Sequence, residues 1–433
     1  MPRVNFRFWR DPDQLPGRYR RPLALRAPMA PRRAQRPPDT RLAVPVLLLI
    51  VFVSLIGFGV VIPLLPFYAS VFDASPWQVT LMFASFSAGQ FLGELTWGRL
   101  SDRIGRRPVL LITILASAAG YVALAYAPTI GVAILVRAFA GFFSGNISTI
   151  QGYIVDVTPS ERLAGRLGLV GGAFGVGFVV GPWLGGVLAR PELGAAGFQP
   201  PLLVAAALCV VATAGVLAFV RESVQNDVAH QVRPGPLASL KEAWSDDVLR
   251  RLIAMTFTGF ASFSAMWAIF GLWGEARFGW GPKEIGFVMG VTGVAAALSQ
   301  SFLSGAIVRR LGPVPTIVGG LLTTGTFLLV QAVSPWIWLC VVAMTLAVAG
   351  HTLTQPATSA LISQAAPPGR QGAILGANNA AGSAARVAGP MVAGLLFSSA
   401  TPWAPIVFSA IGMLPAAWLA WRAGRQIRLR HGG

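Results

Sequence analysis

A small set of residues inside the apolar runs of this chain could hold a charge or handle a proton. Glu94, Arg137 and Arg386 each lie within such a run, and Asp156 lies at the end of one. A charged side chain in apolar surroundings is costly unless it faces a partner or a cavity, and an embedded carboxylate is a natural proton relay. His351 adds an imidazole that titrates near neutral pH. We expect proton handling or ligand binding here, although each residue could instead be structural.

Small and polar residues recur at helical spacing around these positions. Residues three or four apart share one face of a helix, so each series predicts a polar stripe. The stripes are Arg137, Gly141, Ser144, Ser148 and Gln151; His351, Gln355 and Ser359; and Asn379, Ser383 and Arg386. Single polar residues of this kind usually join neighbouring helices. We nevertheless expect a cavity lined by Arg386, Asn379, Ser383, Gln355, His351 and Ser144.

The sequence offers no chemistry typical of an enzyme. Cys209 and Cys340 lie inside apolar runs, and no cluster of Cys and His residues has metal-ligand spacing. There is no nucleophile–base pair and no phosphate-binding loop, so direct use of ATP is not expected. We expect no catalytic residues, no metal site and no cofactor.

Composition favours a membrane protein. Hydrophobic residues make up 54% of the 433-residue chain and charged residues only 12%, and the mean hydropathy is +0.64. A soluble chain carries about twice this charged fraction. The net charge of +18 could suggest a nucleic-acid partner. However, the basic residues lie before the first apolar run and in alternate loops, so no soluble domain remains to bind nucleic acid.

Apolar runs separated by charged or Pro- and Gly-containing breaks predict twelve membrane-spanning helices, because about 20 apolar residues cross a bilayer. The fold class is therefore all-α integral membrane. The predicted spans are 42–68, 77–98, 108–126, 129–153, 165–189, 201–220, 252–275, 284–308, 313–333, 336–362, 373–398 and 403–421. They form a first half, 42–221, and a second half, 252–421, joined by a polar linker, 222–251.

The distribution of basic residues predicts the orientation. Loops on one side of the predicted membrane are rich in arginine, whereas those on the other side hold only Arg190, Arg277 and Lys283. The positive-inside rule then places both termini in the cytoplasm. The segment 1–41 is rich in Arg and Pro and is expected to be a disordered basic tail, with Met29 as an alternative start. Residues 422–433 are expected to form a second cytoplasmic tail.

An internal repeat relates the two halves. Five residues of the first half recur in the second half with one common separation in the sequence. The pairs are Pro159 and Pro367, Arg162 and Arg370, Gly168 and Gly376, Gly181 and Gly389, and Pro182 and Pro390. Parallel repeats of six helices place a substrate site between the halves, near the middle of the membrane.

A dense charged loop follows the second predicted span. Its pattern is Gly98-x-Leu-Ser-Asp102-Arg103-x-Gly105-Arg106-Arg107, and it resembles the loop between helices 2 and 3 of the major facilitator superfamily of transporters. The resemblance implies a cytoplasmic gate in which Asp102 faces the helix that begins near Gly372 and latches the two halves. The alternative is a surface cluster of ion pairs, worth less than about 1 kcal/mol. Glu94, one turn earlier, could belong to this cluster or carry the coupling proton.

The fifth predicted span contains glycines at intervals of four residues. Gly177, Gly181 and Gly185 form one smooth face for close helix packing, and Pro182 interrupts the backbone hydrogen bonding. The series Gly177, Gly181, Pro182, Gly185 and Gly186 resembles the antiporter motif of drug–proton exporters. The context of Arg137, followed by Gly141 and Gly145, resembles the helix 4 motif of the same family, whose arginine is linked to proton coupling.

From about Leu42 onward the chain resembles the twelve-span drug–proton antiporters, especially the tetracycline-exporter branch. That branch has membrane acids at positions matching Ser54, Gly120 and about Thr323, none of which is acidic here. The resemblance implies alternating-access efflux of small amphipathic compounds across a bacterial-type inner membrane, driven by the proton gradient. We expect a monomer, although the sequence does not determine the oligomeric state. With Arg137 and Arg386 outnumbering Glu94, we expect a neutral to positive cavity that prefers anionic or neutral compounds. The alternative is a carrier of small anionic metabolites or nutrients.

Overall fold

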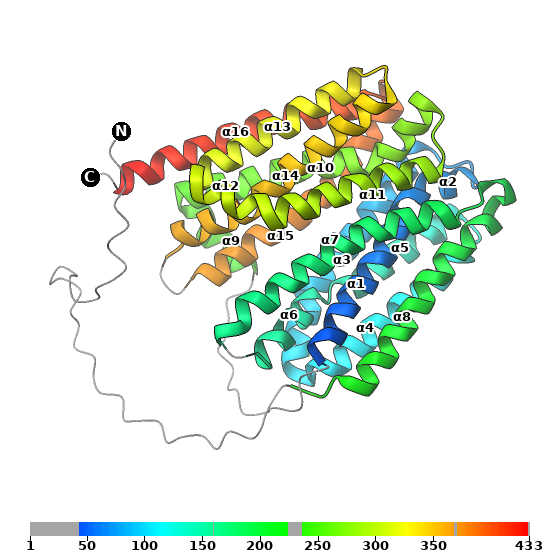
Figure 1. Cartoon of the computed structure of the whole chain (residues 1–433), viewed down its shortest axis with the longest axis horizontal. Coiled ribbons are helices and arrows are strands. Elements are labelled where there is room, and N and C mark those ends of the chain that lie inside the picture. The colour runs from blue at the N-terminus through cyan, green and yellow to red at the C-terminus, as the bar shows by residue number, and fades with distance from the viewer. Residues whose placement is uncertain (1–42, 159, 224–235, 368–369, 432–433) are drawn as a thin grey trace. The chain divides into compact units, whose positions relative to one another are not determined.

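The computed structural model describes residues 43–158, 160–223, 236–367 and 370–431. These residues all lie in one compact unit, Asp39–Gly433. The predicted tail 1–41, much of the linker and Pro159 of the repeat lie outside the described residues. Within the described ranges every regular element is a helix (Figure 1), as the long apolar runs of the sequence predict.

The described residues of the first half form eight α-helices and two short 3-10 helices. Their bounds are α1 Ala43–Val61, η4 Ile62–Leu64, α2 Leu65–Ser70, α3 Pro76–Ile104, α4 Arg106–Ala125, α5 Ile130–Ser144, α6 Ile147–Asp156, α7 Ser160–Leu188, η5 Pro191–Phe198 and α8 Gln199–Phe219. Local sequence sets several of these ends. Ser75 and Gln78 cap α3 reciprocally, with Pro76 at its first turn.

The span predicted at 129–153 is two helices, α5 and α6, which break at Gly145 and Asn146. A Cβ at Gly145 would lie 2.5 Å from the backbone nitrogen of Glu94, so α3 approaches the break closely. Trp97 donates its indole N–H to the carbonyl of Phe142 at 2.7 Å, and Asn146 donates to the Thr113 hydroxyl at 2.8 Å. The Trp97 indole thus gives a donor to the Phe142 carbonyl near the end of α5, and Asn146 joins the start of α6 to α4.

The second half begins with a short helix in the predicted linker. Its elements are α9 Pro236–Ser245, α10 Asp247–Phe278, α11 Pro282–Leu298, η6 Ser299–Leu303, α12 Ser304–Leu311, α13 Pro313–Val333, α14 Ile337–Ala365, α15 Gln371–Ser399 and α16 Ala404–His431. The predicted span 284–308 thus runs through α11, the single π-helical turn η6 and α12. Asp246 caps α10 by accepting hydrogen bonds from the amides of Val248 and Leu249.

The predicted tail 422–433 is helical as far as it is described, because α16 continues to His431. Two pairs of residues, each one turn apart, stack along this helix. The guanidinium of Arg422 lies 4.7 Å from the Trp418 ring centroid, and that of Arg425 lies 5.9 Å from the Trp421 ring centroid. Such cation–π pairs stabilise the helix beyond its apolar part.

Ten helical stretches among the described residues are long and apolar enough to cross a membrane. They correspond to ten of the predicted spans. The helix α3 is not among the ten, and α7 contributes only its shorter apolar part, Gly175–Leu188. The structure therefore fits the prediction of twelve spans, although only ten of them meet the length and hydropathy expected of a membrane-spanning helix.

Equivalent helices pack in equivalent ways in the two halves. Within each half, α1 packs on α7 and α10 packs on α15; between the halves, α7 packs on α11 and α3 packs on α15 (Figure 1). The repeated Gly-Pro pairs lie at matching positions. Gly181 of α7 faces Gly59 of α1, and Gly389 of α15 faces Ala261 of α10. The internal repeat in the sequence thus corresponds to a repeat in the packing.

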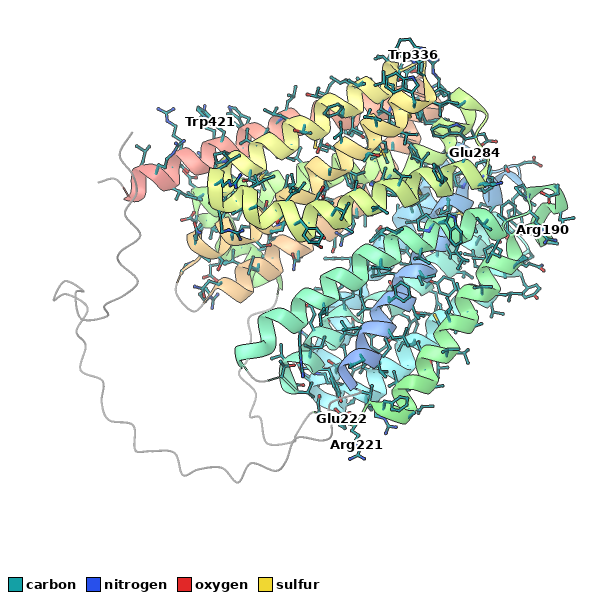
Figure 2. All side chains as sticks on the ribbon, in the orientation of Figure 1. Arg190, Arg221, Glu222, Glu284, Trp336 and Trp421 are labelled. Atoms are coloured by element: carbon teal, nitrogen blue, oxygen red, sulfur yellow. The ribbon has the colours of Figure 1, made fainter. Side chains whose placement is uncertain are left out.

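Charged residues distinguish the two ends of the helices. Arg221 and Glu222 lie at one end, together with the loop that joins α3 to α4; Arg190 and Glu284 lie at the other end (Figure 2). We call these the arginine-rich end and the opposite end. Close backbone contacts join the halves toward the opposite end, where a Cβ at Gly186 of α7 would lie 2.6 Å from the carbonyl oxygen of Pro282 at the start of α11.

Candidate functional site

A cavity of about 410 Å³ lies between the two halves. The first half contributes α3 and α6, and the second half contributes α10, α13, α14 and α15. The lining residues of α3 come from its second half, those of α10 come from its first half, and those of α15 come from its first half and its centre. The cavity is therefore displaced toward the arginine-rich end, away from the backbone contacts that join the halves.

A serine hydroxyl joins two oppositely charged residues of this cavity across the two halves. Ser383 of α15 donates a hydrogen bond to Oε2 of Glu94, which lies on α3, at 3.1 Å. The same hydroxyl accepts a hydrogen bond from the guanidinium of Arg386, one turn along α15, at 2.8 Å. The helical spacing of residues 383 and 386 places both on the face of α15 that meets α3. Each charged group thus has a charge-assisted hydrogen bond to one hydroxyl.

His351 lies beside this pair among aromatic rings. Its imidazole stacks on Phe263 at 3.8 Å between ring centroids and meets Phe260 edge-on at 5.3 Å. Its side chain is 4% exposed, and both ring nitrogens are without a hydrogen-bond partner among the described residues. The Arg386 guanidinium also lies 5.7 Å from the Phe260 ring. Phe260 thus contacts both polar residues, a role that the sequence analysis did not assign to it.

The structure brings most of the predicted cavity residues together. Those that line the cavity are Arg386, Asn379, Ser383, Gln355 and His351. Ser144 does not line it; its hydroxyl donates to the carbonyl of Gly141 in its own helix at 2.9 Å. The expectation for Ser144 is wrong because the break at Gly145 divides the predicted stripe. Beyond the break, Ser148 and Gln151 face the cavity. Whether the lining residues bind a substrate stays a prediction.

Arg137 lies outside this cavity, on the other side of the same break. It is 1% exposed, and its guanidinium covers the ring of Phe86 at 4.2 Å. Two of its nitrogens, Nε and one terminal nitrogen, have no hydrogen-bond partner among the described residues. Arg137 therefore adds no charge to the cavity lining, in which Glu94 and Arg386 balance each other. The sequence predicts a cavity whose net charge is neutral to positive, and the described lining residues correspond to a neutral cavity.

The segment 98–107 that the sequence predicts as a loop is helical except at Gly105, because it forms the end of α3 and the start of α4. Its described ion pairs lie within the first half. Asp102 pairs with Arg106 at 2.7 Å, and Arg106 also pairs with Asp156 at the end of α6, at 3.3 Å. Asp102 and Arg103 are exposed to solvent. The predicted contact of Asp102 with the start of α15 is not the one this conformation shows, because the cavity separates the halves at this end. The gate role of Gly98, Asp102, Arg103, Gly105, Arg106 and Arg107 stays a prediction.

Glu222 binds the start of α4 within this charged segment. Its role was not predicted from the sequence. Its carboxylate accepts hydrogen bonds from the backbone amides of Arg106 at 2.8 Å and Arg107 at 3.1 Å, at the start of α4. Gly105, at φ +102°, adopts a conformation that favours glycine, and a Cβ there would overlap the Glu222 carboxylate. The feature of the sequence that could have indicated this contact is the position of Glu222, an acid that directly follows the sixth predicted span. Glu94 has no described ion pair in this cluster, so it belongs to the cavity.

The glycines of α7 serve two different contacts. Gly177, Gly181 and Gly185 face α1 within the first half, and a Cβ at Gly177 would lie 2.5 Å from that of Leu55. Gly186, on another side of the helix, faces α11 of the second half, as does the Pro182 carbonyl. The helix continues through Pro182. The predicted antiporter motif is thus also a contact between the halves at the opposite end.

Comparisons with known proteins agree with this architecture. The model of the family described as Major Facilitator Superfamily matches residues 47–390 and 267–431. The chain resembles a bacterial homologue of the human lysosomal transporter Spinster in an inward-facing and occupied conformation, with a TM-score of 0.75 and 15% identity over 88% of this chain and 96% of that one. At this identity the likeness concerns the fold alone.

The chain is also similar in sequence to proteins that are named for drug resistance. The chain is 30% identical to the class C tetracycline resistance protein of Escherichia coli, over 80% of this chain and 88% of the relative. It is 24% identical to multidrug resistance protein 2 of Bacillus subtilis strain 168, over 85% of this chain and 92% of the relative. The chain is therefore a multi-pass membrane transporter that belongs to the major facilitator superfamily, in the group of its drug exporters.

Proposed function

We propose that this protein exports small amphipathic compounds in exchange for protons by alternating access. The proposal is supported by the relatives, whose names describe tetracycline and multidrug resistance, and by the cavity between two pseudo-symmetric halves. Transporters with such repeats expose a fixed site to one side of the membrane at a time. The arginine-rich end is the cytoplasmic end in this proposal, following the positive-inside rule.

The observation that carries the proposal is the hydrogen bond between Glu94 and Ser383. It joins a carboxylate of the first half to the second half inside the cavity. A carboxylate that gains or loses partners when the halves move can bind a proton in one state and release it in the other. Glu94 is the group that we assign to the proton. The alternative membrane acids of the tetracycline branch are absent at the matching positions.

Other residues of the site have supporting roles in this proposal. Arg137 acts on coupling through the packing of α5 against α3, since it does not line the cavity. The segment 98–107 acts as the cytoplasmic gate, and it forms its contact with the second half only in the state that closes this end. The cavity lies toward the arginine-rich end, which is where a compound from inside the cell would enter if, as we propose, this end is cytoplasmic.

The experiment is compound-dependent proton release from energised inside-out membrane vesicles, followed with a pH-sensitive dye. The panel holds tetracycline, chloramphenicol, a fluoroquinolone, a lipophilic cation and an organic acid. Glu94→Gln keeps the hydrogen-bonding geometry toward Ser383 but cannot carry a proton. Glu192→Gln, an exposed acid in η5, is the matched control.

Proton release that requires Glu94 but not Glu192 is the expected result. If no compound in the panel releases protons, the exporter proposal is refuted and the carrier of small anionic metabolites or nutrients takes its place. Uptake of small anions into right-side-out vesicles would then be measured. Proton release that persists in Glu94→Gln would assign the coupling proton to another group.

A further inference from the structure

The charged residues of the cavity form one closely spaced pair of opposite sign. Among the described lining residues, Glu94 and Arg386 are the acidic and the basic residue, with His351 as a further titratable group. Both charged groups reach the Ser383 hydroxyl, at 3.1 Å and 2.8 Å. A ligand that enters between the halves meets a negative and a positive site side by side, on the adjacent walls formed by α3 and α15.

This arrangement penalises ligands with a single charge. An anion that binds Arg386 competes with the Ser383 hydroxyl and neutralises the guanidinium, so the Glu94 carboxylate loses its nearby positive charge. A cation that binds Glu94 leaves the guanidinium without a counter-charge in the same way. In both cases an uncompensated charge stays in a half-buried site, which is strongly unfavourable.

A ligand with both charges avoids this penalty. We propose that the cavity selects amphoteric compounds, which carry an acid such as a carboxylate or ionised enol and an amine on one apolar body. The acid binds Arg386 and the Ser383 hydroxyl, and the ammonium binds Glu94. This inference rests on the proposed function, because it takes the cavity to be the substrate site.

The remaining lining suits the rest of such a molecule. Apolar and aromatic side chains surround the charged pair: Phe91, Leu95, Met255, Phe260, Ile317 and Leu321. Neutral hydrogen-bonding groups lie between them, including the Gln355 and Asn379 amides. Apolar walls with a few placed polar groups are typical of sites that bind small organic ligands.

The same arrangement explains why binding would expel a proton. The ammonium group of the ligand and a proton compete for the Glu94 carboxylate, so each weakens the binding of the other by the same factor. Mutual exclusion at one group produces exchange. An acid that lacks an amine would instead separate Glu94 from Arg386 and favour uptake of a proton together with the ligand.

Three derivatives of one quinolone test this selection. Norfloxacin carries a carboxylate and a secondary amine; its N-acetyl derivative keeps only the acid, and its ethyl ester keeps only the amine. Binding to the purified full-length protein in lipid nanodiscs is measured by calorimetry. We expect norfloxacin to bind at least tenfold more tightly than either derivative.

Variants assign each preference to a residue. Glu94→Gln should abolish the advantage of norfloxacin over the N-acetyl derivative, and Arg386→Gln should abolish its advantage over the ester. Because either variant leaves a charge unpaired, the double variant Glu94→Gln/Arg386→Gln keeps the test valid if a single variant does not fold. It should bind all three compounds within about twofold of one another.

Equal binding of all three compounds to the wild-type protein would overturn the inference. So would variants that weaken all three compounds by one common factor. These outcomes differ from a failure of the proposed function, which would show as an absence of proton release with every compound in vesicles. Proton release by the ester and the N-acetyl derivative as effectively as by norfloxacin would leave export intact and refute the charge selection alone.

Discussion

Adding a single methyl group at Gly186 should shift the balance between the two conformations of the proposed alternating-access cycle. A Cβ at this position would lie 2.6 Å from the carbonyl oxygen of Pro282, whereas ordinary contact begins at 3.4 Å. The backbones of α7 and α11 must therefore separate by about 0.8 Å in Gly186→Ala, because neither atom belongs to a flexible side chain. Overpacking of this kind costs about 1–3 kcal/mol, which corresponds to roughly a 5- to 150-fold change in an equilibrium.

The strain acts only when the halves are in contact at the opposite end. It should therefore favour the conformation in which this end is open. Double electron–electron resonance can measure this shift, with nitroxide labels at Glu192 in the first half and Trp336 in the second half. Both positions are exposed, and the buried Cys209 and Cys340 are first replaced by alanine.

Gly290→Ala provides a matched control at the same interface. A Cβ at Gly290 would lie 3.6 Å from the carbonyl oxygen of Val179, which is ordinary contact. Its distance distribution should match that of the wild-type protein, while Gly186→Ala gains a population at longer distance. If both variants gave the same distribution, the argument that the Gly186 contact closes this end would be refuted.

Three other substitutions test separate parts of the structure. Glu222→Gln should lower the free energy of unfolding by about 1–2 kcal/mol, seen as an earlier thermal transition, since it weakens the cap on α4; an unchanged transition contradicts this. Trp97→Phe should cost about 1 kcal/mol, because the Phe142 carbonyl loses its indole donor; Trp244→Phe is the exposed control. Arg137→Gln should abolish proton release but retain compound binding, and loss of both would indicate a structural role.

The helices could be predicted because apolar runs and the breaks between them are local features of the sequence. Periodicity also placed Asn379, Ser383 and Arg386 on one face of α15, and the structure finds all three at the cavity. The prediction that Ser144 lines the cavity was wrong, because helical periodicity holds only along an unbroken helix. The break at Gly145 depends on the close approach of α3, which no local pattern in the sequence reports.

The charged segment 98–107 shows a second limit of prediction from sequence. Its pattern could be recognised, but a sequence does not show which of several conformations a transporter adopts. The expected partner of Asp102 lies in the second half, whereas its partner here is Arg106. Glu222 lies more than a hundred residues from the amides that it caps. Contacts of this kind depend on how α4 and α8 pack, and single-residue spacing does not encode them.

The two halves contribute different chemistry to one site, although their packing is repeated. The first half supplies the carboxylate, and the second half supplies the hydroxyl, the guanidinium and the imidazole. Because Glu94 and Ser383 lie on different halves, any rotation of one half against the other changes their separation. A hydrogen bond to the charged carboxylate in one state and not in the other makes the protonation of Glu94 depend on conformation. Linkage then requires the conformation to depend equally on the proton, and this is the basis of the proton coupling that we propose.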